Sequence, residues 1–197
     1  MIKRLFDIIF SFFGLIVISP LLLVIAILIK KESPGPVFYR GVRMGRGGKP
    51  FRIFKFRTMV ENAEELGGPS TASDDRRLTK IGLSLKKYQL DEIPQLINVL
   101  KGEMSLVGPR PEVPLYIDMM SEEEKKIILS IRPGMTDNAS LWDFHEGEIL
   151  KGSPDPEKTY QEKIRPTKIK LQMEYVKNRS FLLDLKIILK TILKIFQ

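Results

Sequence analysis

The chain has 197 residues, with 32 lysines and arginines against 24 acidic residues, so its net charge is +8. That length suits one domain, or one domain with an anchor. Hydrophobic residues make up 43% of the chain, which predicts a packed core; there is no cysteine, and the one histidine is His145. Disulfides, cysteine-based metal centres and histidine clusters are therefore excluded. Carboxylates, lysines, arginines, hydroxyls and a hard metal ion remain for any chemistry.

Residues 5–29 form a candidate membrane segment, because 20 of these 25 residues are apolar. A helix needs roughly 20 apolar residues to cross a bilayer. A cleavable signal peptide fits poorly, since its apolar region is usually about 7–15 residues long and a small-residue cleavage site follows it.

The flanking charges and an internal proline bear on the topology of this segment. Basic residues stand at both of its ends: Lys3, Arg4, Lys30 and Lys31. Positive residues prefer the cytoplasmic side, so both ends favour the same side. The stretch before Pro20 spans only about 22 Å, less than the hydrocarbon core of about 30 Å. A re-entrant helix broken at Ser19-Pro20 satisfies both observations, and a Pro-kinked spanning helix is the alternative.

The positive charge is concentrated directly after the apolar segment. Residues 30–57 contain nine basic residues and one acid, whereas the rest of the chain is neutral. Beside an anchor, this pattern favours anionic lipid headgroups or phosphates over nucleic acid. At the other end, Lys186, Lys190 and Lys194 recur every four residues in an apolar helix over residues 181–197. This helix lies either in the membrane interface or on the protein's own core.

The middle of the chain predicts a β-hairpin over residues 36–57, where aromatic and β-branched runs flank a Gly-rich turn. Lys55 and Arg57 are two apart in the second run, so they are expected to share one face of that strand. Helices are expected over residues 61–66, 78–90, 94–101, 122–131 and 169–177. Residues 136–166 have no clear pattern, and Trp142 and His145 within them are expected to pack or to lie on the surface.

Asp91 and Glu92 stand at or just before a predicted helix N-terminus, because Pro94 suits a first turn and Gly102 a helix end. Free N–H groups and a partial positive charge there keep a carboxylate ionised and favour phosphate. From the neighbouring sequence alone, Asp91 is either a helix cap or a catalytic residue. Two prolines flank Arg110, which is a bidentate phosphate ligand or an exposed turn residue.

Together these motifs resemble the bacterial sugar transferases, specifically the small monotopic phosphoglycosyl transferases. The resemblance rests on the apolar segment with Ser19-Pro20 and on five motifs that follow it in order over nearly the whole chain. They are FKFRTM (54–59), DDRRLTKIG (74–82), LDEIPQLINVLKGEMSLVGPRPE (90–112), RPG (132–134) and YVKNRSFLLDLKIILKTI (175–192). It favours the catalytic interpretation of Asp91, the phosphate-binding interpretation of Arg110 and the re-entrant interpretation of Ser19-Pro20.

The resemblance implies an α+β fold, with a re-entrant membrane helix over residues 1–31 and a catalytic domain over residues 32–197. That domain is expected to be small, mostly helical and cytoplasmic, with a β-hairpin and interfacial amphipathic helices. The protein would be monotopic on the cytoplasmic face of the bacterial inner membrane, contacting phospholipids and no nucleic acid. A homodimer is left open.

The resemblance also implies a reaction. A sugar-1-phosphate moves from a UDP-sugar to polyprenyl (undecaprenyl) phosphate, UMP leaves, and surface glycan assembly such as that of O-antigen or exopolysaccharide begins. Asp91 would form a covalent phosphosugar ester and Glu92 would help to hold Mg²⁺. The residues expected to neutralise the substrate phosphates are Lys55, Arg57, Arg77 and Arg110.

The chain departs from many relatives after RPG, where TDNASLWDFHEGEILKGSPD replaces a stretch like TGLAQVNGR. Lys86 and Gln89 also stand where relatives often have Arg and Ser. The sugar is therefore open. A non-enzymatic basic adaptor at the membrane surface is the alternative function, although it gives no reason for Asp91, Glu92 and Arg110.

Overall fold

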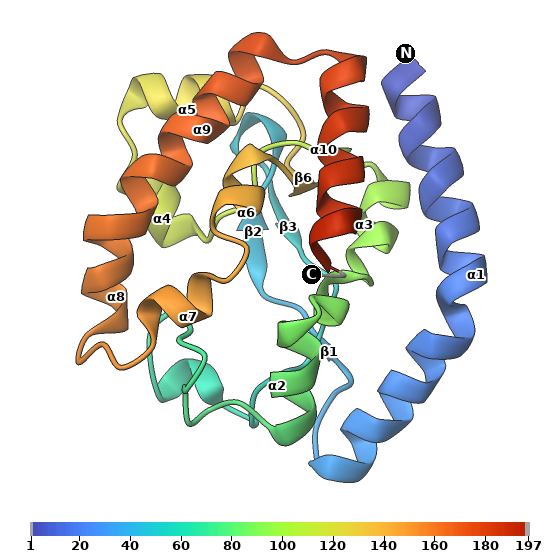
Figure 1. Cartoon of the computed structure of the whole chain (residues 1–197), viewed down its shortest axis with the longest axis vertical. Coiled ribbons are helices and arrows are strands. Elements are labelled where there is room, and N and C mark those ends of the chain that lie inside the picture. Colours follow the sequence, from blue (N-terminus) through green and yellow to red (C-terminus); the bar gives the residue numbers. More distant parts are fainter. Residues whose placement is uncertain (1, 196–197) are drawn as a thin grey trace.

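A computed structural model describes residues 2–195 and shows helices surrounding short strand pairs (Figure 1). The strands are β1 (Phe38–Tyr39), β2 (Val42–Met44), β3 (Pro50–Arg52), β4 (Lys55–Phe56), β5 (Ser105–Val107) and β6 (Gly134–Thr136). The α-helices are α1 (Ile2–Glu32), α2 (Lys80–Lys87), α3 (Gln95–Lys101), α4 (Pro114–Asp118), α5 (Glu122–Ile128), α6 (Asn138–Trp142), α7 (Glu146–Leu150), α8 (Pro156–Thr159), α9 (Arg165–Asn178) and α10 (Phe181–Ile195). Mixed helix and strand were expected, and the model confirms them.

Helix α1 is long and apolar enough to cross a membrane, as expected. It continues through Pro20 as one helix, so the helix is not interrupted at Ser19-Pro20, and the re-entrant path stays a prediction. The hydroxyl of Ser19 donates to the Ile16 carbonyl at 2.8 Å, bonding within the turn that precedes the proline. Figure 1 shows instead that the axis of α1 changes direction along its length. A proline bends a helix without ending it where neighbouring groups compensate for the lost bond.

One stripe of α1 attaches it to the rest of the molecule. Asp7 and Ser11 are buried near its N-terminus, and Ile25 and Ile29 near its C-terminus. Asp7 accepts from the Ser105 hydroxyl at 2.8 Å. Most of the other apolar side chains of α1 are exposed, as a surface that meets lipid would be.

Basic side chains fasten the N-terminal turn of α1 to two other helices. Arg4 donates to the Val99 carbonyl at the end of α3 at 2.8 Å, and Lys3 pairs with Asp184 of α10 at 2.6 Å. At the other end of α1, Ile29 packs in a cluster with Phe56 and Leu85. Both ends of α1 therefore contact the rest of the folded chain.

The predicted hairpin is confirmed. Strands β2 and β3 pair antiparallel, and β1 pairs with β4 further along the same ribbon. Gly47 and Gly48 in the turn between them have positive φ angles of 66° and 71°, which glycine adopts without steric cost. The strand pairing ends at Phe56, however, so Lys55 and Arg57 do not share a strand face.

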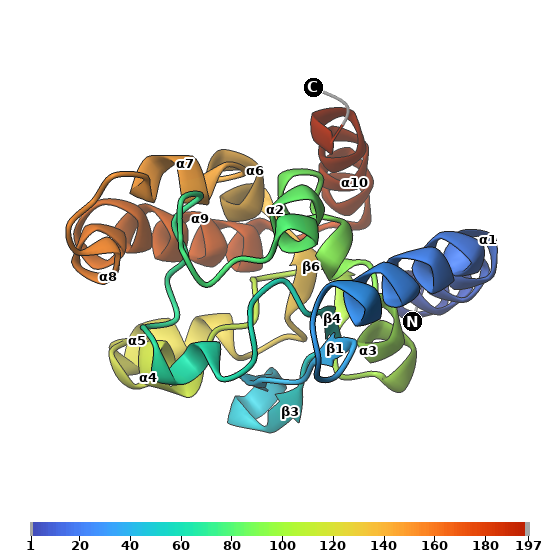
Figure 2. The same ribbon diagram turned by 90° about the horizontal axis from the view of Figure 1, so that it is seen from below.

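The sequence of α10 left two placements open, on the protein's core or in the membrane interface, and the helix has features of both. Asp184 and Ile187 are buried against the core, with Ile187 in a cluster with Val107 and Tyr175. Leu182 and Leu189 stay 78% and 59% exposed. Figure 2 shows the C-terminal half of α10 standing out from the rest of the molecule. The helix therefore packs along one side and leaves an apolar side uncovered.

Residues 136–166, for which the sequence predicts no structure, fold into β6, α6, α7, α8 and a π-helical turn at Tyr160–Ile164. Asp137 and Asp155 cap α6 and α8 through bonds from Ser140 N and Lys158 N. Leu150, Tyr160 and Ile164 bury their side chains around Tyr116. These helices have four or five residues each, too few for a helical period to appear in the sequence.

Candidate active site

Asp91 and Glu92 lie in a 3-10 turn, Leu90–Glu92, between α2 and α3. The helix start predicted from Pro94 is confirmed, because α3 begins at Gln95 with Pro94 at its N-cap. Gln89, just before the turn, has a left-handed φ of 52°. This conformation costs a non-glycine residue about 1–2 kcal/mol. A hydrogen bond from Gln89 Nε2 to the Phe144 carbonyl, at 3.2 Å, offsets part of that cost and holds the turn.

Lys55 contacts both carboxylates of the turn. Its Nζ lies 2.9 Å from Asp91 Oδ2 and 3.1 Å from Glu92 Oε1. Burial lowers the pKa of Lys55, but the charges of Asp91 and Glu92 outweigh it, so the net pKa is raised. Lys55 therefore stays protonated while it lies beside the two carboxylates.

A buried asparagine connects the segment before Lys55 to the helix after the carboxylates. Asn98 of α3 is fully buried; its Oδ1 accepts from Phe54 N at 2.8 Å, and its Nδ2 donates to the Arg52 carbonyl at 3.0 Å. These bonds tie the segment that carries Lys55 to the helix that follows Asp91. Sequence reasoning missed Asn98, since a polar residue within an apolar helix face was its only signal.

Arg110 makes a two-pronged contact with Glu92, with Nη1 3.0 Å from Oε2 and Nη2 bonded to Oε1. Burial alone would raise the pKa of Glu92, but Arg110 and then Lys55 hold it well below its usual range. Arg110 follows β5, whose end meets β6 at Gly108 and Gly134. A Cβ on Gly134 would collide with the backbone of Gly108, so this close approach requires glycine.

Lys86 of α2 lies near the same site and was named in the sequence only as a departure from relatives. Burial, followed by repulsion from Lys55, lowers its pKa to about 8. The carboxylates of Asp91, Glu146 and Glu92 act in the opposite direction. The site thus holds a lysine whose pKa lies below that of an exposed lysine.

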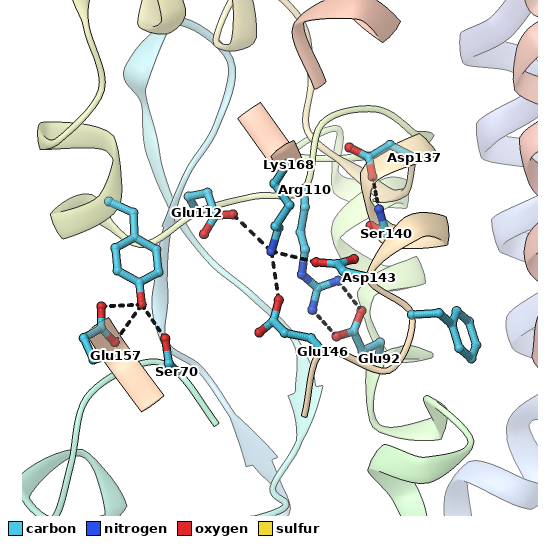
Figure 3. A network of polar contacts seen from close by, with 12 residues as sticks. Ser70, Glu92, Arg110, Glu112, Asp137, Ser140, Asp143, Glu146, Glu157 and Lys168 are labelled. Atoms are coloured by element: carbon cyan, nitrogen blue, oxygen red, sulfur yellow. Dashed lines mark hydrogen bonds and ion pairs between the residues drawn. The ribbon is translucent and has the colours of Figure 1, made fainter. Parts of the chain in front are cut away.

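Figure 3 shows a second group of charged residues, which lies next to Arg110. Lys168 of α9 is 4% exposed, and its Nζ lies 3.1 Å from Glu146, 3.3 Å from Asp143 and 3.8 Å from Glu112. Asp143 and Glu146 come from the segment that departs from relatives, and both raise the pKa of Arg110 after the larger effect of Glu92. Burial raises the pKa of Asp143 to about 7.

Two other predicted phosphate ligands lie elsewhere. The guanidinium of Arg57 donates to the carbonyls of Ser33, at 2.9 Å, and of Pro34, just after α1. Arg77 pairs with Asp75 at 2.7 Å and donates to three carbonyls of the loop before it. The structure therefore brings Lys55 and Arg110 to Asp91 and Glu92 but not Arg57 or Arg77. Both of these arginines therefore bind backbone carbonyls rather than the carboxylate pair.

The donors suited to a hard metal ion at this site are the two adjacent carboxylates. Asp91 is 2% exposed, and its Oδ2, although paired with Lys55, has no well-directed hydrogen bond. Both oxygens of Glu92 accept from Lys55 or Arg110. Within residues 2–195 no three carboxylates or histidines form a metal cage of protein ligands alone. Mg²⁺ is usually held by one or two carboxylates with substrate phosphates and water, and these donors fit that mode.

His145 and Trp142 fit the expectation that they pack or lie on the surface. The His145 ring meets Phe144 edge-on, with centroids 5.1 Å apart. Trp142 is 47% exposed.

Comparisons with known proteins cover the whole chain. The model of a family described as "Bacterial sugar transferase" matches residues 1–197. The chain is 39% identical over 195 residues to UDP-N-acetylgalactosamine-undecaprenyl-phosphate N-acetylgalactosaminephosphotransferase of Aeromonas hydrophila, covering 97% of this chain and 43% of that protein. It is 38% identical over 198 residues to UDP-glucose:undecaprenyl-phosphate glucose-1-phosphate transferase of Klebsiella pneumoniae, covering 98% of this chain and 40% of that protein.

A third relative is of similar length. The chain is 36% identical over 203 residues to the exopolysaccharide production protein PSS of Rhizobium leguminosarum bv. phaseoli, covering 97% of this chain and 93% of that protein. The chain therefore spans less than half of the two transferases and nearly all of the third protein.

Proposed function

Because the chain belongs to the bacterial sugar transferase family, as its motifs predicted, we propose that it transfers a sugar-1-phosphate from a UDP-sugar to undecaprenyl phosphate. The observation that carries this proposal is the contact of Lys55 and Arg110 with the Asp91–Glu92 pair beside α3. The names of the relatives include both glucose and N-acetylgalactosamine transferases. The donor is accordingly a UDP-hexose or a UDP-N-acetylhexosamine, and the product begins a surface glycan.

The reaction proceeds in two displacements at the β-phosphorus of the donor. An oxygen of Asp91 forms a bond to this phosphorus, the bond to the bridging oxygen breaks, and UMP leaves with that oxygen. The phosphate of the lipid then attacks the same phosphorus and releases Asp91, which yields a lipid diphosphate sugar. A carboxylate nucleophile divides one difficult transfer into two easier ones.

The cations of the site do the electrostatic part of this work, since phosphoryl transfer depends on positioning and charge neutralisation. Arg110 orients Glu92 through its two bonds and offers charge to the donor phosphates, and Lys55 holds Asp91. Mg²⁺, carried by Glu92 together with the substrate phosphates, would neutralise the diphosphate further. The low exposure of Asp91 keeps competing water from the ester.

We also propose that α1 enters and leaves the membrane by the cytoplasmic face. Its 31 residues extend about 46 Å. Yet Arg4 near its start and Ile29 near its end both contact the same folded body. A spanning helix would carry its first turn to the far side of the bilayer, away from α3. Protease accessibility of tags at Met1 and Gln197 tests the topology, and protection of one terminus alone would contradict it.

The function is tested by UMP release from a panel of UDP-sugars with Mg²⁺, with and without undecaprenyl phosphate. We expect acceptor-dependent turnover on at least one donor, and a roughly stoichiometric UMP burst without acceptor. Chelation of Mg²⁺ should stop both. Absence of UMP release from every donor, with vesicle binding intact, would support the membrane-surface adaptor instead.

A further inference from the structure

A groove lies between α6 and the C-terminal half of α10, outside the charged site described above. Its volume is about 460 Å³, and the residues that line it are Asn138, Leu141, Trp142, Lys190, Leu193 and Lys194. It combines an apolar wall with two lysines. A ligand that matches both has an anionic head and an apolar body.

The lysines of the groove are available to such a head. Among the carboxylates of residues 2–195, none lies within ion-pair distance of Lys190 or Lys194. Lys194 Nζ lies 5.9 Å from the centroid of the Phe144 ring. Two such cations attract a phosphate group.

The apolar wall continues onto a surface suited to lipid. Trp142 and Leu193 are 47% and 55% exposed. From Leu193 the exposed side chains Leu189 and Leu182 run along α10 toward Phe181. Phe181 meets Phe6 of α1, with ring centroids 5.3 Å apart. Exposed apolar side chains thus lie along α10 between the groove and the contact with α1, where a hydrocarbon chain would find apolar partners.

One hydrogen bond links the segment after α6, a helix that lines the groove, to the turn that carries the reacting groups. Phe144 follows Trp142 by two residues, and its carbonyl accepts from Gln89, which precedes Asp91 by two residues. This bond ties the segment that follows α6 to the turn that carries Asp91. A nucleotide sugar has no apolar body to place against Leu141, Trp142 and Leu193.

We propose that this groove binds the polyprenyl phosphate acceptor, with Lys190 and Lys194 pairing with its phosphate and the apolar wall contacting the first part of its chain. This inference rests on the proposed function, and it assigns a place to the second substrate. Bulk anionic phospholipid is the competing occupant, which the experiments separate.

The first experiment uses Trp142, the only tryptophan of the chain. The full-length protein in neutral detergent is titrated with undecaprenyl phosphate, with undecaprenol and with phosphatidylglycerol, and tryptophan emission is followed. We expect saturable quenching or a spectral shift with undecaprenyl phosphate, and a response at least about tenfold weaker with the other two lipids. An equal response to phosphatidylglycerol, or no response to undecaprenyl phosphate, would overturn the proposal.

The second experiment separates the two half-reactions in Lys190→Gln/Lys194→Gln. The UMP burst without acceptor uses only the donor, so we expect it to be retained. The KM for undecaprenyl phosphate should rise roughly tenfold to thirtyfold, as the loss of two phosphate-pairing lysines implies. Lys186→Gln, on the same helix but outside the groove, is the matched control and should resemble the wild type.

The outcomes distinguish this inference from the function on which it rests. A retained burst with an unchanged KM for the acceptor would overturn the groove assignment alone. An equal rise in KM in Lys186→Gln would also overturn it, because the effect would then come from the general charge of α10. If the wild type gave no burst on any donor, the proposed function would fail, and the fluorescence titration would still decide what the groove binds.

Discussion

Two pairs of basic residues have the same predicted role and different surroundings in the structure. Lys55 and Arg110 face the carboxylates of Asp91 and Glu92, within 3.1 Å of them. Arg57 and Arg77 instead donate to carbonyls at the end of α1 and in the loop after β4. In each case the acceptors around the cation decide whether it can meet a substrate.

The difference arises from backbone direction. Lys55 and Phe56 pair with β1, whereas the chain leaves the strand at Arg57. The side chain of Arg57 then meets the turn after α1, where the carbonyls of Ser33 and Pro34 need donors. A basic residue in a motif therefore contributes either to catalysis or to stability. Substitution distinguishes these roles, because the first lowers turnover and the second lowers the free energy of unfolding.

The largest effect is expected for the nucleophile that the first pair surrounds. Asp91→Asn keeps the size of the side chain but removes its charge, so turnover should fall by more than about 10³-fold. UMP release with Mg²⁺ and undecaprenyl phosphate measures this, with an unchanged circular dichroism spectrum as the control. Substantial turnover in this variant would show that Asp91 is a helix cap and that the chemistry lies elsewhere.

Arg110→Gln comes next, because it removes both bonds to Glu92 and a cation beside the donor phosphates. Turnover should fall by about 10²-fold or more, as for the loss of a preorganised donor. Arg110→Lys should recover only part of the activity, since lysine cannot make the two-pronged contact. If Arg110→Lys matched the wild type, charge alone would be sufficient and the geometry of the pair would not matter.

Lys168→Met tests a buried cation that supports the fold beside the site. It leaves Glu112, Asp143 and Glu146 without their shared partner, which should lower the free energy of unfolding by about 3–5 kcal/mol. The Tm in detergent should accordingly drop by roughly 10 °C. Lys170→Met, exposed on the same helix, is the matched control.

The Tm deficit of Lys168→Met should also depend on pH. The pKa of Asp143 is raised to about 7 by burial, so the folded state binds this proton more tightly than the unfolded state does. Lys168 lowers this pKa, so without Lys168 the pKa should be higher still. Lowering the pH from 8 toward 7 should therefore stabilise the variant more than the wild type and narrow the deficit. A deficit that widened between pH 8 and pH 6 would contradict this assignment.

Arg57→Gln should affect stability more than catalysis, in contrast to Arg110→Gln. Two carbonyls lose a charged donor, which should lower the free energy of unfolding by about 1–3 kcal/mol. The KM for the UDP-sugar should stay near that of the wild type. A large rise in KM with an unchanged Tm would restore Arg57 to the phosphate-binding role that the sequence predicted.

The smallest effect is expected for the pH profile of Lys86→Arg. The pKa of Lys86 is lowered to about 8 by burial and by Lys55, so its charge is present below that pH and lost above it. Donor binding should therefore weaken modestly as the pH rises through 8 in the wild type. Arginine stays charged, so the variant should lack that decline. Identical profiles would show that the charge of Lys86 does not reach the donor.

Much of the site was predictable where its signal is local. The Asp91–Glu92 pair before Pro94, the hairpin that carries Lys55, and Arg110 between two prolines all depend on neighbours in the chain. The group around Lys168 was not predictable, because its partners Glu112, Asp143 and Glu146 come from separate elements. Asn98 was missed for the same reason, since its bonds reach strands more than 40 positions away.

The sequence by itself determined the long apolar segment, the family and the residue types available for phosphoryl transfer, because periodicity, charge and motif spacing are local properties. Only the tertiary structure decided that α1 continues through Pro20 and contacts the folded body at both ends. It alone separated Lys55 and Arg110 from Arg57 and Arg77. The physical reason is that a buried charge takes its role from the acceptors around it, and long-range packing brings those acceptors together.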